Sequence, residues 1–323
     1  MKGKKAGMIL VFLLAAVLGA FFLWSRGSED SGYKSYSKHY VMITEDSDSW
    51  DPVYESALKE AESRDAYLER FGSNLAVKYE RNVLLNLAIQ ASVDGIIVSG
   101  DEEEETAELI NEAVDRGIPV VTVLRDSTGS KRQCFVSINS YNVGQEYGRQ
   151  ILELVTEETR RVMFLADENL VNTSQNLILL GIRETLEKEL GTDHRVSVET
   201  AVVENMRNFS AEESIRDIFL DSENLPDILV CLNEVHTRCA CQAAVDYNKV
   251  GEVQIIGYDD SNIILDAVAK SIIYSTISLD KEQMGRFCIQ ALDEYVETGH
   301  TNGYMAVDTH LLTTEDAAKM TEE

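Results

Sequence analysis

The sequence predicts an α/β fold with two doubly wound parallel sheets, and three observations lead to this. Short runs of β-branched and apolar residues alternate with longer helical patterns along nearly all of the chain after residue 38. Strand candidates such as 95–99 and 119–124 are almost continuously apolar, as is typical of parallel sheets covered on both faces. The same rhythm restarts after residue 138, so we expect two lobes of similar length.

The first series of elements begins near residue 39. Its predicted strands, each rich in β-branched or aromatic residues, cover 40–44, 75–79, 95–99, 119–124 and 134–138. Its predicted helices run from about 51 to 70, from the end of the second strand to about 91, and through an acidic stretch to about 116. Acidic side chains at 101–105 complement the dipole at the start of that last helix, so they need no bound cation.

The second series repeats the pattern and ends with several strands in succession. Helices are predicted at 142–157, 172–190 and 211–220, and strands at 162–166, 196–203, 227–232, 253–258 and 272–277. In sheets of this kind ligands bind in the crevice outside the carboxyl ends of the strands. We therefore look for functional residues directly after each predicted strand.

An apolar run from Ala6 to Trp24 precedes the folded part. At about 1.5 Å per residue a helix of this run reaches roughly 28 Å, which matches the hydrocarbon core of a bilayer. Lysines precede the run and an acidic, serine-rich stretch follows it, so an anchor would leave Met1 cytoplasmic and the rest outside. We expect a single transmembrane helix within residues 1–26, followed by a polar tether at 27–38. A cleaved signal peptide is the alternative, although 18–20 form a poor cleavage site.

Charge and residue composition exclude several classes of function. The 323 residues include 29 basic and 56 acidic side chains, a net charge of −27, so a nucleic acid would be repelled. The five cysteines are irregularly spaced and indicate no disulfide framework. The cluster of Cys231, His236, Cys239 and Cys241 matches no compact zinc pattern. Common nucleophile, phosphate-loop and zinc-protease motifs are absent from the sequence, so we expect no catalytic residue, metal or cofactor.

Five short segments carry a resemblance to a known family. They are Asp94-Gly-Ile-Ile-Val-Ser99, Gly117-Ile-Pro-Val-Val-Thr-Val123, Leu232-Asn-Glu234, Ile255-Ile-Gly-Tyr-Asp-Asp260, and Thr276-Ile277 followed by Gln283-Met-Gly285. Together they resemble the type I periplasmic sugar-binding proteins, the ribose and galactose binders, over nearly all of 39–315. The resemblance implies a non-enzymatic fold whose chain crosses between two lobes three times. Lobe 1 would comprise 39–140 with 280–308, and lobe 2 would comprise 141–279 with 309–323.

The same resemblance implies five ligand-binding residues, and three of them, Trp50, Arg125 and Asn233, have a structural alternative. Trp50 would stack on a sugar ring, or it belongs to the core. Arg125 would clasp ligand oxygens with its guanidinium, or it forms a surface salt bridge. Asn233 would bind a vicinal diol, or it caps the following helix. Asp259 would accept ligand hydroxyl groups, with its neighbour Asp260 as the helix cap, and Ser99 offers a shorter hydrogen-bonding group.

Three departures from the ribose-type pattern affect the expected ligand. Leu124, Ile178 and Leu279 stand where the resemblance would place polar groups. Each buried ligand hydroxyl left without a partner costs about 1 to 3 kcal/mol. A less hydroxylated ligand, a sugar placed differently, or no small ligand at all would each fit this pattern better than a simple hexose or ribose.

The expected function is therefore extracytoplasmic solute binding at the cell membrane. The protein would close around a small, sugar-like ligand and deliver it to an ABC permease. The alternative is a membrane-tethered sensing subunit that reports a ligand, possibly other than a sugar, to a sensor kinase or chemoreceptor. Both alternatives place the N-terminal helix in the membrane and exclude nucleic acid as a partner.

Overall fold

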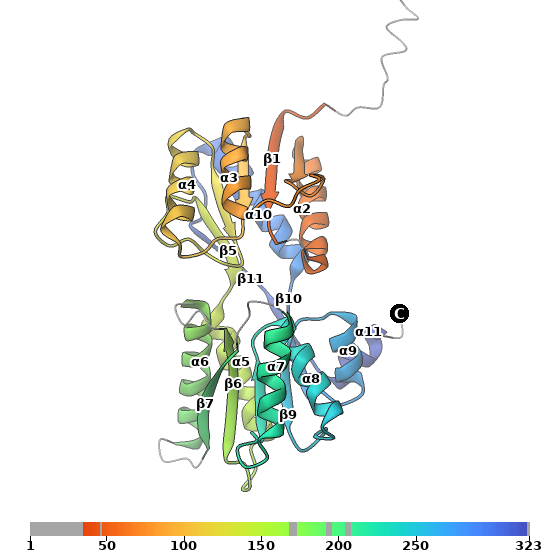
Figure 1. The fold of residues 1–323 in the computed structure, drawn as a ribbon. Coiled ribbons are helices and arrows are strands. Elements are labelled where there is room, and N and C mark those ends of the chain that lie inside the picture. The colour runs from red at the N-terminus through yellow and green to blue at the C-terminus, as the bar shows by residue number, and fades with distance from the viewer. Residues whose placement is uncertain (1–34, 46, 168–172, 192–195, 204–207, 322–323) are drawn as a thin grey trace, which may run out of the picture. The chain divides into compact units, whose positions relative to one another are not determined.

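The computed structural model describes residues 35–45, 47–167, 173–191, 196–203 and 208–321, which form two six-stranded sheets with helices on their faces (Figure 1). The predicted membrane helix at 6–24, and the tether up to residue 34, lie outside the described residues. Across the ranges that are described, no helix is long and apolar enough to cross a bilayer.

The first sheet is parallel throughout, with the strand order β11-β5-β4-β3-β1-β2. Its strands are β1 (Lys38–Ile43), β2 (Ala66–Arg70), β3 (Gly95–Val98), β4 (Val120–Val123), β5 (Cys134–Ile138) and β11 (Tyr304–Val307). One face is covered by α2 (Asp51–Ser63) and α10 (Lys281–Thr298), which pack on each other. The other face is covered by α3 (Arg81–Ala91) and α4 (Glu104–Asp115), and a short 3-10 helix, η1 (Asp48–Trp50), precedes α2.

The second sheet has the order β12-β10-β9-β8-β6-β7 and is parallel except for the β10–β12 pair. Its strands are β6 (Arg161–Asp167), β7 (Ser197–Val203), β8 (Ile228–Cys231), β9 (Gln254–Tyr258), β10 (Ser275–Leu279) and β12 (Thr309–Leu312). Its helices are α5 (Ser140–Leu154), α6 (Thr173–Leu190), α7 (Asn208–Leu220), α8 (Glu234–Asp246), α9 (Asn262–Ala269) and α11 (Thr314–Thr321). The predicted architecture of two parallel-sheet lobes is therefore confirmed.

The chain passes between the two sheets at three places. It leaves the first sheet after β5, returns from β10 through α10 to β11, and crosses again in the single residue between β11 and β12. Two of these passages, at 279–281 and 307–309, are held together because the Asp280 N–H donates to the Asp308 carbonyl at 2.9 Å. The ends of β10 and β11 therefore form one hydrogen-bonded joint.

The sequence prediction is wrong between residues 64 and 80. The helix expected to reach residue 70 ends at Ser63, because Asp65 adopts a left-handed conformation with φ 56° and turns the chain into β2. β2 is an edge strand, and its mixed sequence hides its alternation of buried and exposed residues. The strand expected at 75–79 is an irregular segment instead, so its apolar residues belong to a loop.

The chain beyond residue 280 also carries elements that the sequence prediction does not contain. Strands β11 and β12 add one strand to each sheet, and α11 packs on α9. β10 begins at residue 275 rather than 272, because residues 270–274 form a turn and a bend after α9. Strands β11 and β12 each depend on pairing with a partner strand distant in sequence, which local periodicity does not reveal.

Gly285 is required where α10 crosses α2. A Cβ at this position would lie 2.8 Å from the Ala57 nitrogen and would overlap the Val53 carbonyl oxygen. We expect Gly285→Ala to lower the free energy of unfolding by about 2 kcal/mol or more, because neither backbone can yield easily. Urea unfolding followed by circular dichroism measures this. Gly303→Ala is the matched control, since a Cβ there meets nothing within 4 Å, and an equal loss in both variants would contradict the packing argument.

Candidate functional site

Three polar side chains meet at the carboxyl edge of the first sheet. Glu45 follows β1, Ser99 follows β3 and Arg125 follows β4. The Ser99 hydroxyl donates to Glu45 Oε1 at 3.2 Å, and Arg125 Nε donates to Ser99 Oγ at 3.3 Å. The Arg125 guanidinium also forms an ion pair with Glu45. We call these three residues the strand-end triad, and its atoms offer both donors and acceptors to a ligand.

The strand-end triad lines a pocket of about 690 Å³ on the first lobe. The charged residues in its lining balance, with Arg70, Lys78, Arg81 and Arg125 against Glu45, Glu80, Glu103 and Glu105. The three arginines already hold carboxylates, because Arg70 pairs with Asp51, Arg81 with Asp101 and Arg125 with Glu45. In a chain of net charge −27, this pocket is suited to an uncharged ligand with hydrogen-bonding groups.

A second polar cluster lies where β9 and β10 end. Asp259 is buried and adopts φ 88°, and its carboxylate accepts from Lys281 Nζ at 2.8 Å and from the Ser261 N–H at 2.9 Å. Lys281 Nζ also donates to Asp260 at 2.7 Å, and the Ser278 hydroxyl donates to Asp260 at 2.6 Å. We call Asp259, Asp260 and Lys281 the hinge triad, because Lys281 begins α10 of the first lobe while both aspartates follow a strand of the second.

Burial and ion pairing act against each other in the hinge triad. Burial would lower the pKa of Lys281, but its hydrogen bonds to Asp259 and Asp260 outweigh burial and raise that pKa. Burial would raise the pKa of Asp260, yet the hydrogen bonds from Lys281 and Ser278 lower it. Both groups therefore stay charged across the physiological range.

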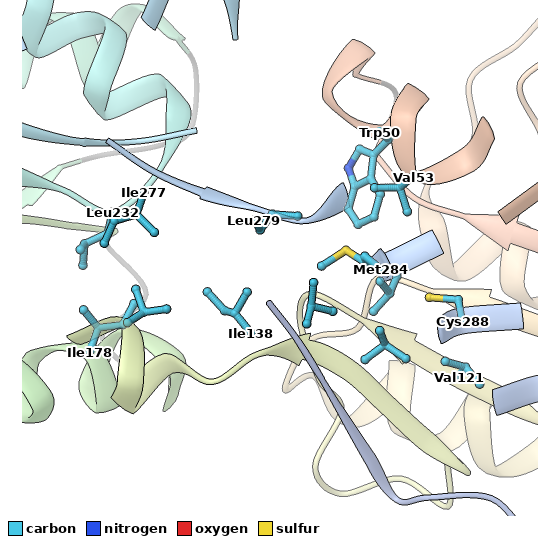
Figure 2. Close-up of a cluster of buried hydrophobic side chains, with 14 of the residues drawn as sticks. Trp50, Val53, Val121, Ile138, Ile178, Leu232, Ile277, Leu279, Met284 and Cys288 are labelled. Atoms are coloured by element: carbon cyan, nitrogen blue, oxygen red, sulfur yellow. The ribbon is translucent and has the colours of Figure 1, made fainter. Parts of the chain in front are cut away.

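Asn233 and Trp50 take the positions that their structural alternatives describe. Asn233 caps α8, because its Oδ1 accepts the His236 N–H at 2.8 Å. Trp50 is 6% exposed and packs in a buried apolar cluster with Val53, Met284 and Leu279 (Figure 2). Neither residue lines the pocket of the strand-end triad, so their roles in ligand binding remain predictions. Asp260 is not a helix cap, since Ser261 precedes α9 in that place.

The structure therefore brings together two of the five predicted residues, Ser99 and Arg125, and adds two that the sequence did not single out. Glu45 joins them from β1, and Lys281 joins Asp259 from α10. Of the three aliphatic departures, Ile178 and Leu279 are buried in the apolar cluster, and Leu124 packs against it. Glu45 directly follows the predicted strand 40–44, and this place at a strand end is the signal in the sequence that could have pointed to it.

The cysteines contribute to packing. All five are free, and Cys134, Cys231 and Cys288 are buried. Burial raises the pKa of these three thiols, which keeps them neutral and poorly reactive. Over the described part of the chain, no group of His, Cys, Asp or Glu residues is placed to hold a metal ion.

Comparisons with known proteins agree with this architecture. The family model described as "Periplasmic binding protein domain" matches residues 39–301. A D-apiose import binding protein from Paraburkholderia graminis is 24% identical over 243 residues, which cover 73% of this chain and 74% of that protein.

Two solved structures illustrate the shared fold. The glucose-galactose binding protein GanP from Geobacillus stearothermophilus has a TM-score of 0.74 at 24% identity, covering 88% of this chain and 99% of that one. A chain of the XylFII–LytSN complex has a TM-score of 0.70 at 22% identity, covering 86% and 98%. At these identities the likeness shows the fold alone, while the family model covers most of the chain. The chain therefore belongs to the periplasmic binding protein domain family, and it is a binding protein rather than an enzyme.

Proposed function

We propose that this protein is an extracytoplasmic solute-binding protein that closes its two lobes around a small, sugar-like ligand and delivers it to an ABC permease. The observation that carries the proposal is the strand-end triad, in which a carboxylate, a hydroxyl and a guanidinium meet in one pocket at the carboxyl edge of a parallel sheet. Lobe 1 would comprise 39–140 with 280–308, and lobe 2 would comprise 141–279 with 309–323.

The chemistry of the triad supports a hydroxylated ligand. Adjacent hydroxyl groups on a sugar each donate and accept, so a carboxylate and a guanidinium side by side can bind both at once. The matched relatives named for D-apiose and for glucose and galactose make a sugar the first class to test. Asp259 would add a carboxylate from the second lobe, Asn233 an amide and Trp50 an aromatic face for stacking.

The proposed location is the outer face of the cell membrane. Membership of this family supports an extracytoplasmic domain, and the apolar run from Ala6 to Trp24 would serve as its anchor. A tether of about a dozen residues would keep the lobes near a membrane partner and raise their effective concentration there.

A sensing role is the second candidate. The fold is shared with a chain of the XylFII–LytSN complex, in which two different proteins assemble. An anchored binding protein would report its ligand to a sensor kinase or chemoreceptor through such an assembly. Deleting the gene distinguishes the roles: lost uptake of the bound ligand supports transport, whereas unchanged uptake with a lost transcriptional response supports sensing.

The first experiment is a thermal-shift screen of residues 38–323, the compact unit that contains both sheets. Sugars, inositols and amino acids are the ligands to test, and one present at about 100 times its dissociation constant should add about 2.7 kcal/mol of stability. Arg125→Met should weaken any binding found by at least about tenfold, because it removes a charged donor from the pocket.

The control for this screen is Arg149→Met, which changes an exposed arginine on α5 that pairs with Glu146 and lies outside the pocket. A ligand whose affinity is unaffected by Arg125→Met would place the binding site elsewhere. If no compound raises the melting temperature, small-solute binding loses its support.

A further inference from the structure

The segment between β2 and α3, together with the first turn of α3, exposes apolar side chains at the pocket. Leu75 and Tyr79 are each 47% exposed, Val83 is 43% exposed, and all three line the pocket that holds the strand-end triad. Val77, between them in sequence, is 60% exposed. Within the described part of the chain, none of these four joins a buried apolar cluster. Their apolar surface therefore faces water when the pocket is empty.

The pocket lining thus combines two kinds of chemical group. The strand-end triad supplies charged and hydroxyl groups, and Leu75, Tyr79 and Val83 supply exposed apolar surface. Its volume of about 690 Å³ lies in the range of pockets that hold drug-sized ligands. A molecule bound by the triad would have this apolar surface beside it.

We infer that the ligand is amphipathic: a sugar-like head that binds the strand-end triad, joined to an apolar substituent that lies against Leu75, Tyr79 and Val83. This inference rests on the proposed function, since it names the class of ligand for the same pocket. Burying the substituent would remove apolar surface of both partners from water, and the Tyr79 ring could pack on a flat group. An unsubstituted sugar would contact only the polar groups of the pocket lining.

Matched glycosides test the inference with the full chain. Isothermal titration calorimetry compares methyl and phenyl β-D-galactopyranoside, and the corresponding glucoside, xyloside and arabinoside pairs. We expect the phenyl member of the binding pair to bind at least about tenfold more tightly. Leu75→Ser and Tyr79→Ser should reduce this ratio toward one while the affinity for the methyl glycoside stays the same.

Leu220→Ser is the control, because Leu220 is an exposed leucine at the end of α7 outside the pocket. Equal binding of both glycosides by the unaltered chain would overturn the inference and leave the proposed function standing. Weakening of both glycosides to the same extent by Leu75→Ser would also overturn it, since the segment would then support closure rather than touch the substituent. If neither member of any pair binds, the sugar class itself fails. If Tyr79→Ser does not fold, the double variant Tyr79→Phe with Leu75→Ser replaces it. The ratio of phenyl to methyl glycoside affinity should then fall because of the Leu75 substitution alone.

Discussion

Replacing Lys281 with Met should destabilise the protein by about 3 kcal/mol at neutral pH, because it leaves two neighbouring carboxylates without their shared cation. Asp259 is almost completely buried and Asp260 is largely so. Ligand affinity should fall as well, since Asp259 would lose the lysine that orients its carboxylate. Urea unfolding and calorimetry measure the two effects, and Lys281→Arg should restore much of both.

The stability of Lys281→Met should change with pH in the direction opposite to that of the natural protein between pH 7 and 4. The lowered pKa of Asp260 gives a contribution to stability that is complete above about pH 3.9 and is lost as the pH falls through the folded value. The raised pKa of Lys281 gives a contribution complete below about pH 10.4 and lost as the pH rises through its folded value. Without the lysine, burial and repulsion from the Asp259 carboxylate would raise the pKa of Asp260. The variant should therefore gain stability as the pH falls from 7 to 4.

The elements that meet at the hinge triad carry other titratable groups, so a control is needed. They are Tyr258 on β9, Asp280 and Glu282 at the start of α10, Asp308 between β11 and β12, and His310 on β12. Lys249→Met changes a lysine of similar burial that pairs with Glu252. The argument fails if Lys281→Met and Lys249→Met show the same pH profile.

Asp293→Ala should cause a loss of stability of about 3 to 5 kcal/mol, because it removes the common partner of two cations and a buried phenol. The Asp293 side chain on α10 is 2% exposed. It pairs with Lys38, accepts from Arg64 Nη1 at 3.2 Å, and accepts from the Tyr40 hydroxyl at 3.1 Å. Thermal and urea unfolding measure the loss.

Lowering the pH should abolish the contribution of Asp293 to the stability of the fold. Burial would raise the pKa of this carboxyl, but hydrogen bonds from Lys38 and Arg64 outweigh burial and lower it. Its contribution is therefore complete above about pH 3.9 and is lost as the pH falls through the folded value. Asp266→Ala is the control, because Asp266 forms an exposed pair with Lys270 that contributes about 0.5 kcal/mol at most. Similar losses in both variants would show that the buried network contributes little.

The sequence predicted the parts of the fold that local pattern determines. Apolar runs such as 95–98 and 120–123 became central strands, since burial on both faces leaves few other choices. Local pattern does not reveal the edge strand β2, because it depends on Asp65 turning the chain after α2. Apolar residues at 75–79 look like a core strand in sequence, yet the structure places them at a pocket.

The site was predicted only as far as strand ends identify it. Ser99 and Arg125 follow strands that are neighbours in the sheet, so their meeting follows from strand order. Glu45 also ends a strand, but nothing local shows that its carboxylate reaches both of them. Lys281 was hidden for a different reason, since its partners lie across the joint between the lobes and more than twenty residues earlier in the chain.

Helix α10 joins the hinge triad to the place where the chain enters the fold. Its first residue, Lys281, holds Asp259 and Asp260, and twelve residues later Asp293 holds Lys38, at the start of β1. At 1.5 Å per residue these two attachments lie about 18 Å apart along one stiff rod. A movement at the joint between the lobes therefore has a direct mechanical route along α10 to Lys38, at the start of the first strand of the fold.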